Sequence, residues 1–445
     1  MEQTFPKVLI LIKNHIDSIA GTSASLRNWF YHWPKENLAH IYSYAGPTKE
    51  KFCKYTYRVS GKDRAFGSIF DRLKRSAVGL AVIKISNDGH RKRFKASISK
   101  FLKDCGLWEF FFPPKISHDL DKWIRSFSPQ IIYVQGGGDL YFIWLALKIY
   151  RKYNIPICFQ VSDDWPQFLY KGTFLSPLLR PIVLRAFKEI SMCAAVRLSI
   201  GHSMSTEYKT SYNIDFDPMM VCDDSHRFAD VMPKLIKDPS EIKIIYTGNL
   251  ELQRWRSILD LYEATMDLRI NGRKIGIYVF ANDISQETKE AFANKHGLYL
   301  MEIPSHEALP SLLKSADLLF VPESFDPNYF WNLHLSISTK AHLYMMSERP
   351  VLVYGPSYSG VVDYAKKSGW GFVVTKRDRN LLINAISSIV SDKVLCTAMV
   401  ESGRRTVAIN HEATIVRERF RNSLVAAVNK NSFSAEFGDK QCNPE

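Results

Sequence analysis

Two hydroxyl side chains and a lysine stand together in the second half of the chain, at Ser338, Thr339 and Lys340. An apolar stretch with helical spacing follows them, then a buried-strand pattern at 351–353 that stops at Gly355. A helix N-terminus presents unpaired N–H groups and about half a positive charge, so it attracts anions. Hydroxyls and a lysine would add hydrogen-bond donors and a full charge. The pattern predicts a phosphate-binding site, although an ordinary Ser/Thr helix cap beside a surface lysine would also explain it.

A pair of carboxylates, Asp163 and Asp164, follows another apolar run at 155–161. A carboxylate at the carboxyl end of a strand could position or deprotonate a substrate hydroxyl. One of the two could instead cap a helix that begins near Pro166. The pair is therefore a candidate acid–base site, with Asp164 preferred and Asp163 as the second choice.

Gly21 and Thr22 form a turn after the first predicted strand, where a glycine would let the backbone approach a phosphate. A plain connection between strand and helix is the alternative. Neither this turn nor the glycines at 136–138 have the G-x-G-x-x-G spacing of a dinucleotide site. Three further candidates fall at or just after predicted strand ends: Gly248, Ile303 and Glu323. The candidates thus gather at the strand ends.

Strand and helix patterns alternate along the chain, stop at a polar connection over 215–240, and then start again. Such alternation is typical of parallel sheets with right-handed crossovers, so we predict an α/β protein with two doubly wound domains. The expected strands are 8–12, 131–134, 155–161 and 198–201, then 242–246, 276–280, 299–303, 318–321 and 351–353. The expected helices are 23–33, 140–153, 203–212, 256–271, 286–295, 307–315, 339–347 and 360–368.

A chain of 445 residues is longer than the chains that usually fold around a single hydrophobic core. We expect an N-terminal domain over 1–225 and a C-terminal domain over 240–410. A helix over 411–428 would pack back on the first domain, followed by a disordered tail over 429–445. Ligands of open parallel sheets bind at the carboxyl ends of the strands, so the two domains should face each other across a cleft.

Seven cysteines are scattered without a C-x-x-C pair, which favours a reducing compartment and argues against a disulfide framework or a zinc site. The N-terminal apolar run is too short for a signal peptide, and no stretch approaches the ~20 apolar residues of a membrane span. A soluble cytoplasmic protein is expected.

The net charge of +14 is unevenly placed, because residues 71–104 hold ten Lys/Arg against three Asp. This segment reads as two basic amphipathic helices around a turn, which suits an anionic membrane surface. An ordinary solvated helix face is the alternative. Nucleic acid is not expected as a partner, since no recognised binding module or aromatic–basic interleaving accompanies the charge.

The block "ADLLFVPESFD", the triplet "STK" and the block "RPVLVYGP" together resemble the nucleotide-binding domain of GT-B glycosyltransferases. The resemblance is to the retaining group-1 (GT4-like) type of bacterial surface-polysaccharide biosynthesis. It extends over "IYTGNLELQRWRSILDLYEA", "IGHSMSTEY", "DDWP" and "GTSASLRNWFYHWPKENLA", and so covers most of residues 1–425. The resemblance implies two Rossmann-like domains facing across a cleft, the first for the acceptor and the second for the nucleotide sugar.

The resemblance also implies a hexosyltransferase-type enzyme that transfers the sugar of a UDP- or GDP-linked donor to a polysaccharide or polyprenyl-linked acceptor. No cofactor or metal is expected, and the sugar would keep its anomeric configuration. Arg254 and Lys340 would flank the diphosphate, where cationic groups neutralise the leaving group. The nucleotide-sugar contacts would come from Gly21, Thr22, Gly248, Ile303, Glu323, Ser338 and Thr339. The enzyme would work in the cytoplasm, peripherally at the inner face of the plasma membrane.

One position departs from the family pattern. Leu343 stands where many members have a glutamate that binds the ribose, and leucine cannot make that hydrogen bond. His342 could substitute, or the nucleotide would be held less tightly. Two rival interpretations stay open: a degenerate GT-B protein that binds without catalysis, and a sugar-nucleotide epimerase that needs no acceptor.

Overall fold

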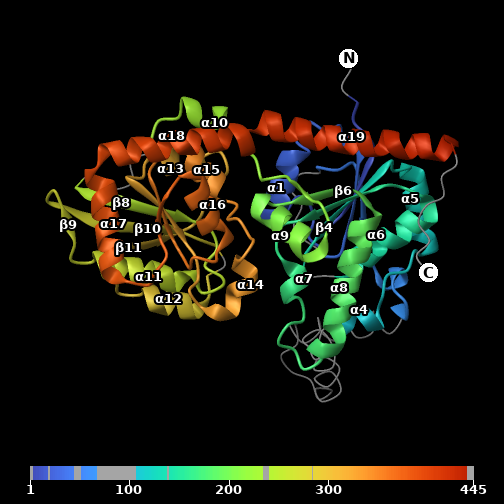
Figure 1. Cartoon of the computed structure of the whole chain (residues 1–445), viewed down its shortest axis with the longest axis horizontal. Helices are drawn as coiled ribbons and strands as arrows, with labels where there is room; N and C mark the ends of the chain where they lie inside the picture. Colours follow the sequence, from blue (N-terminus) through green and yellow to red (C-terminus); the bar gives the residue numbers. More distant parts are fainter. Residues whose placement is uncertain are drawn as a thin grey trace, which may run out of the picture. The chain divides into compact units, whose positions relative to one another are not determined.

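The computed structural model describes residues 4–18, 21–44, 52–67, 107–137, 140–233, 240–282 and 284–437 (Figure 1). The basic segment 71–104 lies outside these residues. The chain forms two compact units, Met1–Met219 with Arg417–Glu445, and Met220–Val416. The return of the chain to the first unit after Val416 makes that unit discontinuous in sequence.

A parallel sheet of seven strands forms the centre of the first unit, in the order β3-β2-β1-β4-β5-β6-β7. Val8 in the interior strand β1 pairs with Leu38 on one side and Ile131 on the other. The central strands are buried along their length because helices cover both faces, which explains their nearly continuous apolar sequence. The strands are β1 (Val8–Leu11), β2 (Leu38–Tyr42), β3 (Tyr55–Arg58), β4 (Ile131–Gly136), β5 (Ile157–Val161), β6 (Ala194–Ser199) and β7 (Asp217–Pro218).

The helices of this unit follow their strands in regular βα order. Helix α5 shows how local sequence sets the bounds, since the Ser117 hydroxyl accepts from the Leu120 amide at the start and Ser128 ends the helix in the left-handed region. The helices are α1 (Gly21–Trp29), α4 (Trp108–Phe111), α5 (His118–Phe127), α6 (Leu140–Tyr153), α7 (Trp165–Phe168), α8 (Ser176–Cys193) and α9 (His202–Tyr212).

The last helix, α19 (Ala413–Phe437), joins the first unit from Arg417 onward. Phe420 is fully buried, with its ring centroid 5.0 Å from Phe30 and 5.3 Å from Trp29. The helix continues through Phe437, whereas the sequence predicted a disordered tail from 429. The tail prediction is therefore wrong for 429–437, because a helix anchored by tertiary packing propagates into a stretch that lacks an apolar pattern.

A second parallel sheet forms the centre of the other unit, in the order β11-β10-β8-β12-β13-β14, with the short β9 antiparallel to β10. The strands are β8 (Glu241–Thr247), β9 (Arg269–Ile270), β10 (Arg273–Phe280), β11 (Leu298–Met301), β12 (Leu318–Pro322), β13 (Val351–Tyr354) and β14 (Phe372–Val374). Apolar clusters fill both faces of this sheet. It is a doubly wound α/β unit like the first.

Two groups of helices cover these faces. One cluster contains α11 (Arg254–Thr265), α12 (Gln286–Phe292) and α17 (Arg379–Ser391), and the other contains α10 (His226–Ala229), α13 (Leu309–Lys314), α15 (Ala341–Met346) and α16 (Gly360–Ser368). α14 (Phe330–Leu333) and α18 (Lys393–Asn410) complete the unit. Within the described residues no single helix is long and apolar enough to span a bilayer. Helices α17 and α18 together reach that length and hydropathy, but they are bent by 90° with respect to each other.

The predicted fold class is confirmed, since every expected strand overlaps an observed one. Strands β2, β3, β7, β9 and β14 were not predicted. β2 carries a fully buried histidine, His40, and β3 alternates in burial at the edge of the sheet, so neither has the continuous apolar run that marked the others.

The packing of α19 gives a stability prediction. Phe420→Ala should lower the free energy of unfolding of the first unit by about 3–5 kcal/mol, because it leaves a cavity between α1, the sheet and α19. Phe174→Ala is the matched control, since its side chain is 90% exposed and should leave the thermal midpoint unchanged. Equal midpoints for the two variants would contradict the packing described.

Candidate active site

The carboxyl ends of three neighbouring strands in the second sheet place the candidate residues. Gly248 follows β8, Glu323 follows β12 and Gly355 follows β13, while Arg254 opens α11 after the β8 turn. Neighbouring parallel strands end at the same edge, so residues far apart in sequence converge there. The structure brings together four of the predicted residues at this edge: Gly248, Arg254, Glu323 and Lys340.

Arg254 and Glu323 form a largely buried ion pair. The Arg254 Nε donates to the Glu323 Oε2 at 2.9 Å, with side-chain exposures of 15% and 4%, and its Nη1 donates to Asn249 Oδ1 at 3.0 Å. Burial acts to lower the pKa of Arg254, but Glu323, Tyr246 and Glu251 together outweigh it and the pKa is raised. The Ser257 hydroxyl donates to the Glu323 carbonyl at 2.6 Å, which fixes the backbone beneath the carboxylate.

Lys340 lies next to this pair. Its Nζ donates to the Tyr246 hydroxyl at 3.3 Å and stands 5.0 Å from the centre of that ring. Burial, reinforced by the charge of Arg254 and opposed by Glu323, lowers the pKa of Lys340 to about 7. The ammonium is therefore easily neutralised here, and a nearby anion would restore its charge.

Gly248 makes room for the lysine. Its φ of +139° is strained for other residues, and a Cβ at this position would lie 1.8 Å from Lys340 Cε. The Gly248 amide donates to the Phe280 carbonyl at 2.8 Å, so the turn is held in the sheet. A glycine is thus required both by the backbone and by the approach of Lys340.

The hydroxyl step lies outside the helix. Helix α15 begins at Ala341 with Lys340 at its N-cap, and Ser338 and Thr339 belong to the preceding turn. Lys340 makes no side-chain capping bond, and the Ser338 carbonyl accepts from the Ala341 amide at 3.0 Å. The prediction of a helix from 339 is wrong by two residues. The Thr339 side chain is exposed and that of Ser338 is half-buried.

Two other positions are not joined to this cluster by the observed contacts. Ile303 follows the edge strand β11, and its amide donates to Asn282 Oδ1 at 3.3 Å. Leu343 packs at the margin of an apolar cluster, and His342 is buried with its ring 5.7 Å from that of His411. His342 is therefore stacked inside the unit.

The aspartate pair of the first unit divides into one buried and one exposed residue. Asp164 is 1% exposed and accepts from the Tyr208 hydroxyl at 3.0 Å, while Asp163 is exposed. Burial raises the pKa of Asp164 to about 7, against the hydrogen bond from Tyr208. Asp164 stands at the N-cap of α7 but makes no side-chain capping bond. Asp163 is thus the more accessible of the two, and the preference for Asp164 stays a prediction.

Gly21 and Thr22 form the first turn of α1, where their side chains are not described. The loop before them is held by α1, because the Ser23 hydroxyl donates to the His15 carbonyl at 3.2 Å and Arg27 Nη1 donates to the Ser18 carbonyl at 2.8 Å. Residues 15–18 are therefore anchored to α1.

The sequence analysis missed three side chains that shape these sites. Tyr246 contacts Lys340, and Asn249 contacts Arg254. Both belong to the stretch "IYTGNLELQRWRSILDLYEA", whose polar residues could have indicated them. Trp165 is buried beside the aspartates, and its Nε1 has no hydrogen-bond partner among the described residues. A Cβ on Gly136 would lie 2.5 Å from this nitrogen, which explains the glycine at the end of β4.

Solved structures match nearly the whole chain. Alr3699/HepE from Anabaena, crystallised with UDP, has a TM-score of 0.62 at 10% identity and covers 94% of this chain and 100% of that chain. A glycosyltransferase from Rickettsia africae ESF-5 has a TM-score of 0.56 at 12% identity, with 97% and 99% covered. The chain has the GT-B fold.

WaaG, a glycosyltransferase involved in lipopolysaccharide biosynthesis, is a third GT-B match, with a TM-score of 0.54 at 12% identity over 93% of this chain and 98% of that chain. No protein-family model and no curated protein sequence matches this chain. At these identities the GT-B likeness shows the fold, and the chemistry must be argued from the residues.

The charges around Lys340 predict its titration. The Lys340 ammonium should titrate near pH 7, well below the ~10.4 of an ordinary lysine. Glu323→Gln should lower that pKa further and Arg254→Gln should raise it, because the two neighbours act with opposite signs. The pKa can be measured by NMR, from the pH dependence of the Lys340 Cε resonance in lysine-labelled protein. The Lys340→Arg variant assigns that resonance. An ordinary lysine pKa, or shifts of the same sign in both variants, would contradict this site.

Proposed function

We propose that this chain is a glycosyltransferase that moves a sugar from a nucleoside diphosphate sugar, UDP- or GDP-linked, to a polysaccharide or polyprenyl-linked acceptor. The observation that carries the proposal is the convergence of Arg254, Lys340 and Gly248 at the carboxyl edge of the second sheet. Two cationic groups beside a glycine turn suit a diphosphate. The GT-B fold supports the same reaction class by analogy.

The chemistry follows from the charge that develops as the glycosidic bond breaks. The diphosphate leaves with an added negative charge, and Arg254 and a recharged Lys340 would stabilise it. We propose that these cations serve in place of a metal and that Glu323 keeps Arg254 oriented. Retention of configuration would follow if the acceptor hydroxyl attacks from the face that the diphosphate leaves.

The acceptor would lie in the first unit. Asp163 is exposed at the carboxyl end of β5 and could accept the proton of the attacking hydroxyl. Asp164 would position that segment through its hydrogen bond with Tyr208. We place the enzyme in the cytoplasm, peripherally at the inner face of the plasma membrane, where a polyprenyl-linked acceptor would be presented.

One observation favours alternative functions in which the chain binds nucleotide sugars but does not transfer the sugar to an acceptor. Leu343 stands at the ribose position and packs against an apolar cluster, so a ribose hydroxyl finds no carboxylate there. A chain that binds nucleotide sugars without transfer, or one that changes the sugar without an acceptor, would share the diphosphate site. Product analysis separates the three, because only a transferase releases nucleoside diphosphate in step with a glycosylated acceptor.

The proposal predicts the effect of removing each cation. Arg254→Ala and Lys340→Ala should each cost about 2–4 kcal/mol of transition-state stabilisation, measured as kcat/KM for nucleoside diphosphate release. The donor is chosen first by ligand-induced melting shifts with UDP, GDP, ADP and dTDP and their sugars. Arg256→Ala is the matched control, because this arginine lies on the same helix with its side chain 49% exposed. Wild-type turnover in both site variants would refute the assignment.

Gly248 offers a second test with its own control. Gly248→Ala should push Lys340 aside and lower nucleotide-sugar affinity about tenfold or more. Gly272→Ala introduces the same kind of backbone strain at φ +78°, where no atom lies within 4 Å of the added Cβ. Both variants should lose some stability, but only the first should lose affinity in titration calorimetry. Equal affinities would place the diphosphate elsewhere.

A further inference from the structure

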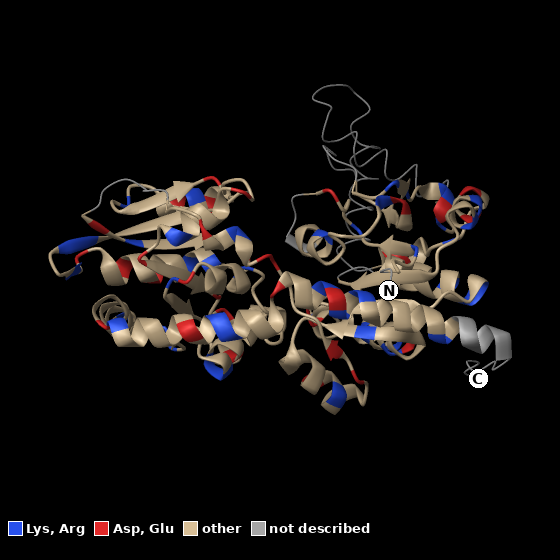
Figure 2. Cartoon of the chain, turned by 90° about the horizontal axis from the view of Figure 1, so that it is seen from above, with Lys and Arg blue, Asp and Glu red and all other residues tan. Residues whose placement is uncertain are grey.

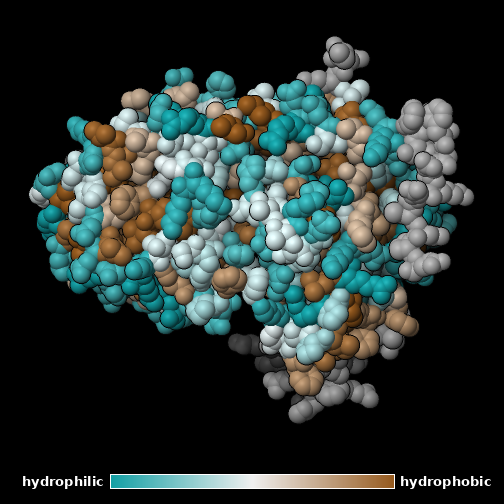
Figure 3. Space-filling model, in the orientation of Figure 1, coloured by the Kyte–Doolittle hydropathy of each residue, from teal (hydrophilic) through white to brown (hydrophobic). Residues whose placement is uncertain are grey.

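One end of the first unit exposes four large apolar side chains, here called the aromatic tip: Phe66, Phe111, Phe174 and Leu178. Their exposures are 70%, 53%, 90% and 62%. Single exposed apolar residues are ordinary on protein surfaces, but a group of them marks an interaction site. In Figure 3, apolar surface is visible around the lower end of α8, where Leu178 lies in the first turn.

The segments that carry the tip are neighbours in space. The Ala65 amide donates to the Pro113 carbonyl at 3.0 Å, which joins the Phe66 segment to the one that follows α4. The Tyr170 hydroxyl donates to Glu109 Oε2 at 2.7 Å, which joins α4 to the loop before α8. Figure 1 shows α4 and the start of α8 at the same end of the unit.

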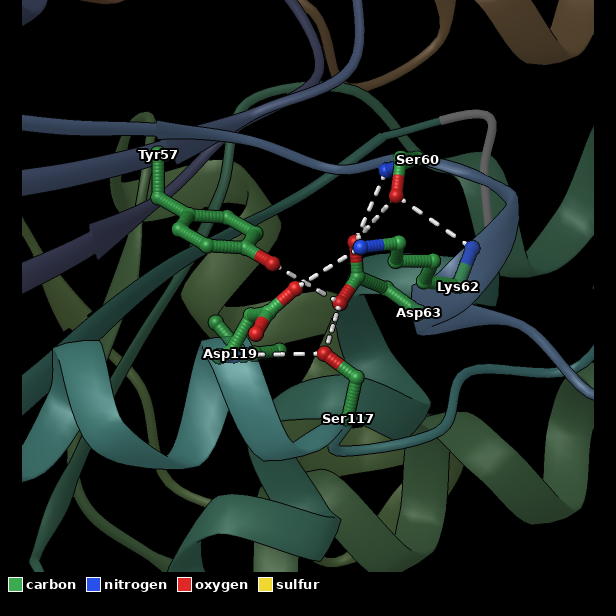
Figure 4. A network of polar contacts seen from close by, with 7 residues as sticks. Tyr57, Ser60, Lys62, Asp63, Ser117 and Asp119 are labelled. Carbon is green, nitrogen blue, oxygen red and sulfur yellow. Dashed lines mark hydrogen bonds and ion pairs between the residues drawn. The ribbon is translucent and has the colours of Figure 1, made fainter.

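The base of the tip is firmly built. The Asp63 carboxylate is fully buried and accepts from the Ser60 amide at 2.8 Å, from the Ser117 hydroxyl at 2.6 Å and from the Tyr57 hydroxyl at 3.0 Å (Figure 4). This network ties the turn before Phe66 to the start of α5. The exposure of Phe66 therefore belongs to a fixed part of the fold.

Lysine side chains lie beside two of the segments that carry the tip. A cavity of about 580 Å³ beside Phe66 is lined by Lys62, Arg64, Lys115 and His118, with Asp119 paired to Lys62 at 3.1 Å. Lys171 is exposed three residues before Phe174. Along the described chain, basic and acidic residues are interspersed (Figure 2).

The charge of the sequence points to the same end. Residues 71–104 carry an excess of seven positive charges. The described chain stops at Gly67 and resumes at Leu107, beside Phe66 and α4 respectively.

We propose that the aromatic tip docks on an anionic lipid surface, with its four apolar side chains inserted at the headgroup boundary and the lysines against lipid phosphates. Exposed apolar side chains with lysines beside them fit interfacial membrane binding, to which each basic residue adds attraction. A protein interface fits less well, since interface cores are depleted of lysine. The inference goes beyond the sugar-transfer reaction and does not depend on it.

The test compares two double variants of the full chain. Phe174→Ser with Leu178→Ser should lower the partition coefficient onto phosphatidylcholine–phosphatidylglycerol vesicles about tenfold or more, because two inserted side chains are lost. Val394→Ser with Ile409→Ser is the matched control, since these side chains are 80% and 66% exposed on α18. The control should bind like wild type. Vesicles without phosphatidylglycerol, or high salt, should weaken binding of wild type as well.

Several outcomes would overturn the proposal. Equal vesicle binding by the tip variant and wild type would contradict it. A failure of wild type to bind anionic vesicles would contradict it as well. A lower thermal midpoint for the tip variant than for the control would mean that protein, such as residues 71–104, covers these side chains. Lipid-independent self-association of wild type that the tip variant loses would assign the surface to a second copy. The nucleotide-induced melting shift should be the same in all variants, which keeps this test separate from that of the diphosphate site.

Discussion

The site depends on the ion pair between Arg254 and Glu323. An unpaired charge buried at the end of β8 would be strongly destabilising, so each partner is tolerated through the other. The pair also ties the start of α11 to the end of β12 and holds the guanidinium beside Lys340. Burial, reinforced by that guanidinium, lowers the pKa of Lys340. An anion bound here, as we propose for the diphosphate, would recharge the lysine.

The architecture was largely readable from the sequence because buried parallel strands are continuous apolar runs. The helices over 140–153 and 360–368 have the predicted bounds. Strand β2 was not predicted because His40 interrupts its apolar pattern. The helix beyond residue 429 was not predicted because packing earlier in α19 sustains it. Local pattern therefore predicts elements well where burial alone decides them.

The site was predicted less completely, because its geometry depends on contacts between distant residues. Lys340 meets Tyr246, 94 positions away, and Asp164 is turned inward by Tyr208, 44 positions away. Nothing in the order of two adjacent aspartates shows which one faces solvent. The motifs around Gly248, Arg254, Glu323 and Lys340 did converge as predicted, since each follows or precedes an element whose position the alternation had set.

The central claim is that the diphosphate of a nucleotide sugar binds on Arg254 and Lys340. Titration calorimetry of a nucleoside and of its diphosphate, on wild type and on the double variant Arg254→Ala with Lys340→Ala, tests it most directly. The diphosphate should bind wild type far more tightly than the nucleoside does, and that difference should nearly vanish in the double variant. A difference of the same size in both proteins would show that the diphosphate is held by other groups.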